Sequence, residues 1–259
     1  MRNLLIVFLL MIWGVCFATS TPLSVMLPPG QYRPLLKVTE DSSKRIKVES
    51  FKMDKYPVTN KDFVSFVKNN PKWKKSNVPS LFAGSEYLKL WKDDVTLGKK
   101  APEDAPVVFI SWFAAKAYCE SKGKTLPTEA QWEYAAAASP TKKFAAYEDA
   151  SFQKKILEWY GNPTSHPLGA VGKNDANIYG IYDLHERVWE WVLDFNNGLV
   201  TGESRGDRTL DQKMFCGSGA SGSVDPGDYA TFMRYAFRSS LKANYTVSNL
   251  GFRCAKELE

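Results

Sequence analysis

The sequence predicts an α+β fold with a large share of loops, and two observations predict it. Before residue 161, short strand-like segments are interspersed with segments in which apolar residues recur every three or four positions, as in helices. After residue 161, Gly, Pro, Asn and Asp are dense and the helical periodicity disappears. The 259 residues, 44% of them hydrophobic, are enough for one large domain with a substantial core.

The first 18 residues are typical of a secretory signal peptide. Arg2 precedes a short apolar run, and small residues follow it near Ala18. The run is shorter than the roughly 20 residues that span a membrane. We expect cleavage after Ala18, a single domain over residues 19–259, and a protein that is periplasmic or secreted and keeps no membrane contact. An uncleaved anchor is the alternative.

The charge pattern does not indicate a nucleic-acid partner. The net charge of +6 is mild and spread along the chain. Basic clusters such as residues 72–75 carry no interleaved stripe of aromatic side chains.

The first predicted elements are a strand and a helix. Apolar and polar residues alternate over residues 46–53, as in a half-buried strand. Thr59-Asn60 can cap a helix over about 60–69, which Pro71 ends. Its expected buried face consists of Phe63, Phe66 and Val67.

The next region is predicted to be a long loop followed by a strand and a helix. Residues 70–105 are mostly loop, with four aromatic residues that we expect to anchor it to the core rather than to bind a ligand: Trp73, Phe82, Tyr87 and Trp91. Residues 107–110 read as a short buried strand. Ser111 caps a helix over 112–121, and Gly123 ends it.

Two further helices are predicted before the loop-rich half. Thr128 and Gln131 form a capping box, in which the hydroxyl accepts a backbone N–H and the amide reaches back. The residues expected to face inward are Trp132, Ala135 and Ala136. A helix over residues 149–160 follows, with an apolar face of Ile156, Leu157 and Trp159.

Three segments, taken in order, resemble the formylglycine-generating enzyme (sulfatase-modifying factor) family. They are Pro57-Val58-Thr59-Asn60, the residues from Trp112 to Tyr134, and the pair Gly180–Trp191 with Gly251-Phe252-Arg253-Cys254. The similarity covers roughly residues 40–255. It implies the family's loop-rich fold, which is related to C-type lectin domains, and a structural disulfide between Cys119 and Cys254. Both cysteines lie in segments that should be buried.

The chain departs from the family where the chemistry should be. The enzymes oxidise a substrate cysteine with copper held by a pair of their own cysteines, between the two C-terminal signatures. This interval holds only Cys216 here. One thiolate can bind copper(I) but cannot form a bis-thiolate site. We therefore do not expect formylglycine synthesis by the family mechanism, and whether the chain is an enzyme stays open.

The remaining metal candidates each have a structural alternative. Cys216 and His185 could hold copper or iron, but Cys216 could be a small buried hydrophobe and His185 a hydrogen-bonded structural group. For calcium, Glu186-Arg187 replaces the family's Gly-Asn, and arginine cannot supply the oxygen ligand. Asn174 and Asp175, with Asn177, could ligate one ion or could form turns.

The resemblance also implies a binding groove. Trp189 matches a groove residue of the family, whereas Trp191 and Trp132 are expected in the core. Ser218, in the glycine-rich stretch after Cys216, is a further ligand-binding candidate. Arg234 and Arg238 would share one face of an arginine-rich strand and could clamp a carboxylate or a peptide backbone. A structural ion pair is the alternative.

These observations predict an exported domain that binds a protein or peptide partner or assists its maturation. Asp183-Leu184-His185 and the residues after it look most like exported bacterial proteins encoded with copper nitrite reductase in denitrifiers. Two alternatives stay open. One is a metal-dependent oxidoreductase that acts on a peptide or a cofactor precursor, and the other is a structural or ligand-binding lectin-like domain.

Overall fold

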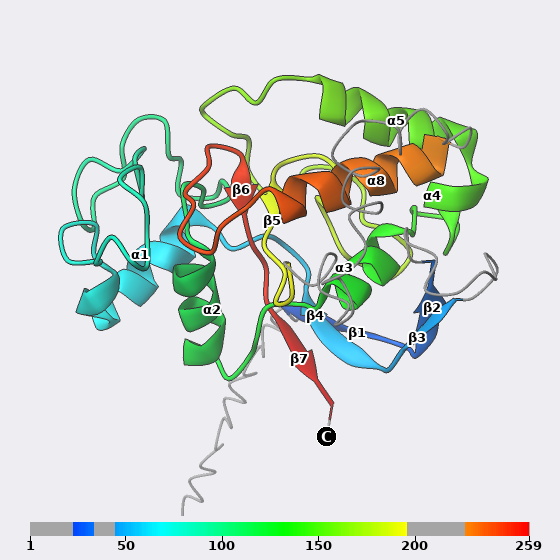
Figure 1. Cartoon of the computed structure of the whole chain (residues 1–259), viewed down its shortest axis with the longest axis horizontal. Coiled ribbons are helices and arrows are strands. Elements are labelled where there is room, and N and C mark those ends of the chain that lie inside the picture. The colour runs from blue at the N-terminus through cyan, green and yellow to red at the C-terminus, as the bar shows by residue number, and fades with distance from the viewer. Residues whose placement is uncertain (1–22, 34–44, 196–225, 259) are drawn as a thin grey trace, which may run out of the picture.

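A computed structural model describes residues 23–33, 45–195 and 226–258 of the chain (Figure 1). The predicted signal peptide and the candidates Cys216 and Ser218 lie outside the described residues. Within them, no helix is both long enough and apolar enough to cross a membrane.

Five short strands form two small antiparallel sheets. β1 (Ser24–Leu27), β4 (Phe51–Asp54) and β7 (Ala255–Glu257) form an antiparallel sheet in the order β1-β4-β7. β2 (Gly30–Tyr32) pairs with β3 (Ile46–Val48) in a separate sheet. The prediction of one strand over residues 46–53 was therefore wrong, because it divides into β3 and β4. Pro28 and Pro29 have no backbone N–H to continue the ladder between the two sheets.

The first helix follows the prediction closely. α1 spans Asn60–Asn69, and Thr59 caps it in a reciprocal box with Asp62. A short 3-10 helix, η1 (Pro71–Trp73), follows at the proline that was expected to end α1. The expected buried face of α1 is confirmed, because Phe63, Phe66 and Val67 are all buried.

The loop after α1 is anchored to the core by its aromatic side chains, as predicted. Trp73, Tyr87 and Trp91 are buried, and the Trp91 indole donates to the side-chain oxygen of Asn60 at 3.0 Å. The predicted strand at residues 107–110 was wrong. That segment is buried, but Phe109 has a φ of +57° and the amides of Val107 and Phe109 bond to separate segments, so no regular ladder forms.

α2 (Trp112–Ser121) and α3 (Glu129–Ala136) begin at the predicted caps, Ser111 and Thr128. The capping box of α3 is present, with Gln131 as the reciprocal partner. Two helices follow: α4 (Ala145–Glu148), which was not predicted, and α5 (Ala150–Gly161), which Asp149 caps.

The C-terminal half positions the candidate site. Between α5 and β5 (Trp189–Glu190) the described chain has no helix or strand, in agreement with its Gly, Pro and Asn content. β5 pairs in parallel with β6 (Leu250–Gly251). α8 (Pro226–Ser239) runs across the top of the molecule in Figure 1, packed against α5 and linked to α3 by ion pairs. The expected arginine-rich strand was therefore wrong, because its arginines lie on a helix.

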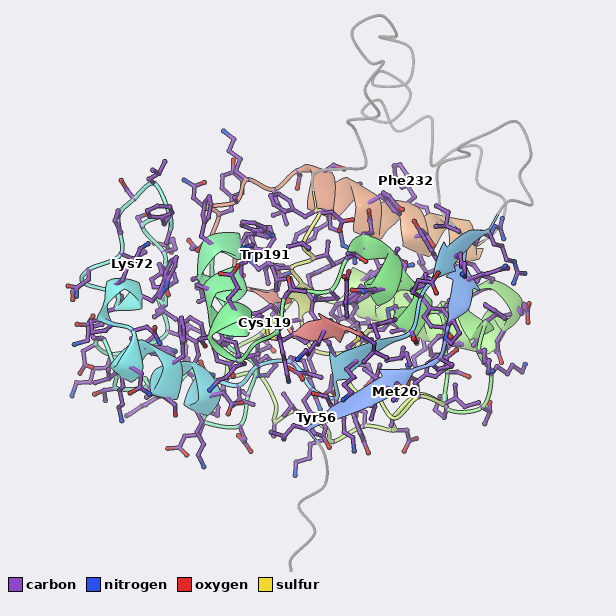
Figure 2. All side chains as sticks on the ribbon, turned by 90° about the horizontal axis from the view of Figure 1, so that it is seen from below. Met26, Tyr56, Lys72, Cys119, Trp191 and Phe232 are labelled. Carbon is purple, nitrogen blue, oxygen red and sulfur yellow. A yellow bond between two sulfur atoms is a disulfide. The ribbon has the colours of Figure 1, made fainter. Side chains whose placement is uncertain are left out.

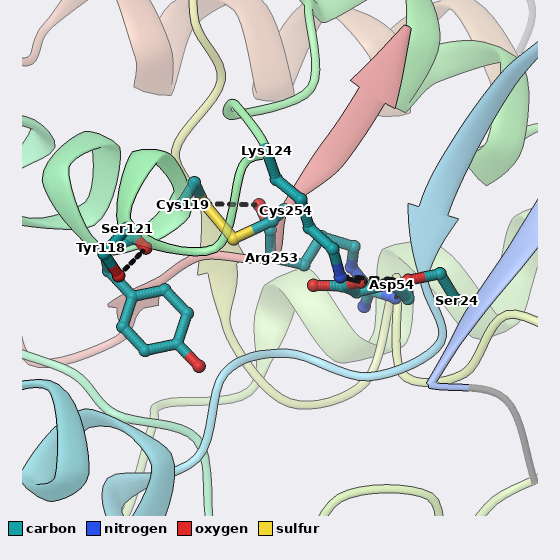
Figure 3. The surroundings of a disulfide bond; sticks show 8 residues. All are labelled: Ser24, Asp54, Tyr118, Cys119, Ser121, Lys124, Arg253 and Cys254. Carbon is teal, nitrogen blue, oxygen red and sulfur yellow. Dashed lines mark hydrogen bonds and ion pairs between the residues drawn. A yellow bond between two sulfur atoms is a disulfide. The ribbon is translucent and has the colours of Figure 1, made fainter. Parts of the chain in front are cut away.

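The predicted disulfide is present. Cys119, on α2, bonds to Cys254, which precedes β7, and both cysteines are fully buried (Figure 3). The bridge closes a loop with a sequence separation of 135 residues. Figure 2 shows Cys119 and Trp191 inside the molecule, whereas Met26 of β1 lies at its outside. Trp132 and Trp191 are both buried, as the sequence predicted.

Candidate functional site

Four aromatic side chains from three elements form a partly exposed cluster, which we call the aromatic surface. Trp159 and Tyr160 come from the last turn of α5, Trp189 from β5 and Phe237 from α8. The Trp189 ring is central: its centroid lies 4.7 Å from that of Tyr160, 4.6 Å from Phe237 and 5.4 Å from Trp159. Such close contacts hold the rings in fixed positions.

A pocket of about 320 Å³ lies beside the aromatic surface. Its lining combines Trp159, Tyr160 and Trp189 with neutral groups that can donate or accept hydrogen bonds, among them the side chains of Asn162, Thr164 and Asn249. None of the described residues that line this pocket carries a charge. Apolar rings with a small number of polar groups are typical of sites that bind uncharged ligands or extended peptide backbone.

Arg234 and Arg238 lie beneath the aromatic surface instead of facing a ligand. Both are buried, and both point from α8 toward α3. Arg234 donates to both carboxylate oxygens of Glu133, and Arg238 donates to Glu133 and Glu129 at 2.8 and 2.9 Å. This arrangement is the structural ion pair that the sequence left open as the alternative.

The same cluster fixes one ring of the aromatic surface. A guanidinium nitrogen of Arg234 donates to the hydroxyl of Tyr160 at 2.9 Å. The Arg238 guanidinium lies over the Trp132 ring, 4.8 Å from its centroid. The charges of the two arginines are therefore used internally, and their effect on the site is to hold Tyr160 in place.

The two carboxylates of the cluster have different proton affinities. Burial alone would raise the pKa of Glu133, but the charges of Arg234 and Arg238 outweigh it and lower that pKa to about 2. Burial dominates at Glu129, which accepts one hydrogen bond from Arg238, and it raises the pKa of Glu129 to about 7.

His185 is buried and partly engaged. Its Nε2 is 2.8 Å from the carbonyl oxygen of Ala136, and its ring packs edge-on against Trp132 and Phe152. Burial lowers the pKa of His185 to about 3, so the ring is neutral. His185 lies four residues before Trp189 in the sequence, but it is not one of the four rings of the aromatic surface.

The candidate metal ligands are not brought together in the described structure. Asn177 is buried, and its side-chain oxygen accepts the amides of Tyr179 and Ile181, which makes it a turn-forming residue. Asn174 is partly exposed and Asp175 is exposed. Among the residues that the structure describes, no group of three or more His, Cys, Asp or Glu side chains is arranged to hold a metal ion.

Sequence reasoning missed three members of the aromatic surface. Trp159 was noted only as an apolar residue of its predicted helix, and neither Tyr160 nor Phe237 was singled out. A signal was available for the first two, because a Trp-Tyr pair directly before Gly161 places large rings at a helix end. The position of Phe237 follows only when residues 226–239 are recognised as a helix.

Comparison with known proteins gives the family. Residues 16–258 match the model of the sulfatase-modifying factor enzyme 1-like domain, and the chain belongs to this family. It is 28% identical to inactive C-alpha-formylglycine-generating enzyme 2 of Mus musculus, over 90% of this chain and 85% of that protein. It is also 28% identical to formylglycine-generating enzyme of Mus musculus, over 84% of this chain and 69% of that enzyme.

A solved structure agrees with the fold. PvdO from Pseudomonas aeruginosa superposes with a TM-score of 0.50 and 20% sequence identity, over 91% of this chain and 94% of the PvdO chain. At that identity the likeness establishes the fold alone. The mixed α/β architecture with this family's fold, which the sequence predicted, is thus confirmed.

Proposed function

We propose that this chain is a non-catalytic member of the family that binds an extended segment of another exported protein on its aromatic surface. The observation that carries the proposal is the set of four packed, partly exposed rings beside an uncharged pocket. The proteins with similar sequence include ones named as inactive formylglycine-generating enzymes. In this chain the interval between the C-terminal signatures holds a single cysteine, Cys216.

The geometry of the surface suits a peptide segment. The Trp189 ring is held between Tyr160 and Phe237, and Arg234 fixes the Tyr160 hydroxyl. A rigid aromatic platform loses little conformational entropy when a ligand binds. The amides of Asn162 and Asn249 at the pocket can pair with peptide groups.

The partner that we propose is a copper enzyme of denitrification, copper nitrite reductase, in the compartment to which the signal peptide would direct this chain. The motivation is the sequence pattern from Asp183 to Asn196 together with the predicted signal peptide. The chain would hold the partner during its maturation. This proposal places both proteins in the periplasm or outside the cell.

The experiment is a binding measurement between the mature chain and copper nitrite reductase of the same organism, by biolayer interferometry. We expect Trp189→Ala to weaken binding at least 30-fold, because truncation of a central aromatic anchor costs about 2 kcal/mol or more. Tyr245→Ala is the matched control, because Tyr245 is an exposed aromatic residue that does not line the pocket. Equal affinities for wild type and Trp189→Ala would refute the aromatic surface, and no binding at all would refute this partner.

The metal-dependent oxidoreductase remains the second candidate, and the same preparation tests it. The metal content of wild type and of Cys216→Ser is measured after incubation with copper(I), iron(II) and calcium. Stoichiometric copper or iron that is lost in Cys216→Ser, together with oxygen consumption, would replace the binding proposal by the enzyme. Under the binding proposal, partner affinity is the same for both proteins with and without added metal.

A further inference from the structure

A second, smaller pocket lies next to the aromatic surface, and we call it the acidic pocket. It has a volume of about 70 Å³, and its charged or titratable lining consists of Asp175, Asp183, His185, Glu186 and one cation, Lys155. Glu186 also lines a neighbouring hollow whose other walls include Trp159 and Asn162. A ligand that lies on the aromatic surface could therefore reach the acidic pocket past Glu186.

Asp183 is the most buried charge of the acidic pocket and has an incomplete set of partners. Its side chain is fully buried, and Oδ2 accepts the amide of Gly172 at 2.6 Å. Oδ1 accepts no hydrogen bond. The nearest cation, Nε of Arg187, is 3.6 Å away and also has no hydrogen-bond partner. Burying a carboxylate oxygen without a hydrogen-bond donor costs free energy, and a bound donor would recover part of that cost.

Two other side chains of the pocket also keep an acceptor atom without a partner. Nδ1 of His185 is buried and has no hydrogen-bond partner among the described residues. Because Nε2 lies against the Ala136 carbonyl oxygen, which can only accept a hydrogen bond, Nε2 carries the proton and Nδ1 keeps a lone pair. Oε2 of Glu186 is buried and unbonded, while its Oε1 pairs with Lys155. The residues that line the pocket thus include Asp183, His185 and Glu186, each with one buried acceptor atom that has no hydrogen-bond partner among the described residues.

The charges of the described side chains that line the acidic pocket or pair with its carboxylates do not balance. Asp175, Asp183 and Glu186 carry three negative charges, and the paired cations Lys155 and Arg187 carry two positive ones. His185 is neutral. One negative charge remains, which a single monovalent cation would neutralise. Burial raises the pKa of Asp183 despite its neighbouring arginine.

We propose that the acidic pocket binds a primary ammonium group, supplied by a lysine side chain of the partner segment. An ammonium group carries one positive charge and three N–H donors and accepts no hydrogen bond, which matches the charge and the unpaired acceptors of the pocket. This inference rests on the proposed function for the source of the amine.

The test uses n-butylammonium as the probe and the backbone amide of Gly172 as the reporter, because that amide bonds to Asp183. n-Butylammonium is titrated into the mature chain, and the chemical shift of the Gly172 amide is followed by NMR. We expect a saturable shift with n-butylammonium and none with n-butanol, which has the same chain without the charge. Asp183→Asn and Glu186→Gln should each lower the affinity for n-butylammonium at least tenfold.

Glu158→Gln is the matched control, because Glu158 is an exposed carboxylate on α5 outside the pocket lining. It should leave the affinity for n-butylammonium unchanged. A folded wild-type chain that shows no saturable shift with n-butylammonium, or an equal shift with n-butanol, would overturn the proposal. A response to calcium alone would also overturn it, because the site would then be an oxygen-ligand cation site.

The inference and the proposed function fail separately. Trp189→Ala should still bind n-butylammonium, because Trp189 does not line the acidic pocket. If the copper enzyme does not bind while n-butylammonium does, the ammonium pocket stands and the proposed partner falls. If the copper enzyme binds but n-butylammonium does not, only the ammonium pocket is refuted.

Discussion

Glu190 and Asp183 are buried carboxylates only seven residues apart, yet their surroundings differ completely. Both oxygens of Glu190 are occupied: Arg253 donates to each of them at 2.8 Å, and the Trp132 indole donates to one at 2.8 Å. Asp183 has one occupied oxygen and one without a hydrogen bond. The comparison separates a carboxylate whose two oxygens are both bonded within the fold from one that keeps an oxygen without a hydrogen bond.

The contacts of Arg253 explain why Glu190 has a structural role. Besides Glu190, it donates to the backbone carbonyls of Asp54, Lys55 and Tyr182. One guanidinium thus joins the end of β4, the loop before β5 and the chain that leads to β7 (Figure 3 shows Arg253 beside the disulfide). Asp183, by contrast, accepts one hydrogen bond among the described residues, from the Gly172 amide, and its ion pair with Arg187 is longer, at 3.6 Å.

The largest effect is expected at Glu190. Glu190→Gln leaves Arg253 as a buried cation without its counter-charge, and breaking a buried pair in this way costs about 3–5 kcal/mol. Urea unfolding followed by circular dichroism measures the loss as a lower midpoint. A loss below about 1 kcal/mol would show that the Glu190 site is not structural and would remove the contrast with Asp183.

An intermediate effect is expected at Glu129, and it depends on pH. Burial raises the pKa of Glu129 from its ordinary value of 4.5 to about 7. Because the folded state holds this proton more tightly than the unfolded state, the contribution of Glu129 to stability is complete below pH 4.5. It is lost as the pH rises through about 7.

We therefore expect the wild type to lose about 1–3 kcal/mol relative to Glu129→Gln when the pH rises from 4.5 to 8. Urea midpoints of both proteins across that range give the difference. Glu158→Gln, an exposed carboxylate on α5, should show no such divergence from wild type. Parallel pH curves for wild type and Glu129→Gln would contradict the raised pKa.

The smallest effect is expected at Asp183. Asp183→Asn retains an oxygen that can accept the Gly172 amide, and asparagine tolerates the left-handed backbone at this position, where φ is +62°. It also removes a buried charge that lacks a full set of partners. We expect the free energy of unfolding at pH 7 to change by no more than about 1 kcal/mol. A loss as large as that of Glu190→Gln would mean that Asp183 is as architectural as Glu190.

The sequence predicted local structure better than it predicted the site. The caps at Thr59, Ser111 and Thr128 were readable because an N-cap and its hydrogen-bond partner lie within three residues. The disulfide followed from the resemblance of Cys119 and Cys254 to paired family positions. The arginines of α8 were misplaced on a strand because the resemblance, and not their helical spacing, decided that element.

The candidate site was partly predicted for a physical reason. Trp189 was named from its motif, but its neighbours Tyr160 and Phe237 come from helices far from it in the sequence. Which acceptor atoms remain unpaired, as at Asp183 and His185, depends on contacts with Gly172 and Ala136 that no local pattern encodes. Tertiary packing alone determines both features.

The central claim is that the aromatic surface is where a partner binds. The most direct measurement places a photo-crosslinking amino acid at position 162, on the pocket wall, and at the exposed position 148 as a control, in the chain produced by the native organism. We predict adducts from position 162 that map to one segment of one exported protein, are absent from position 148, and disappear when Trp189→Ala is added. The same adducts from both positions, or adducts from position 162 that persist with Trp189→Ala, would contradict the account.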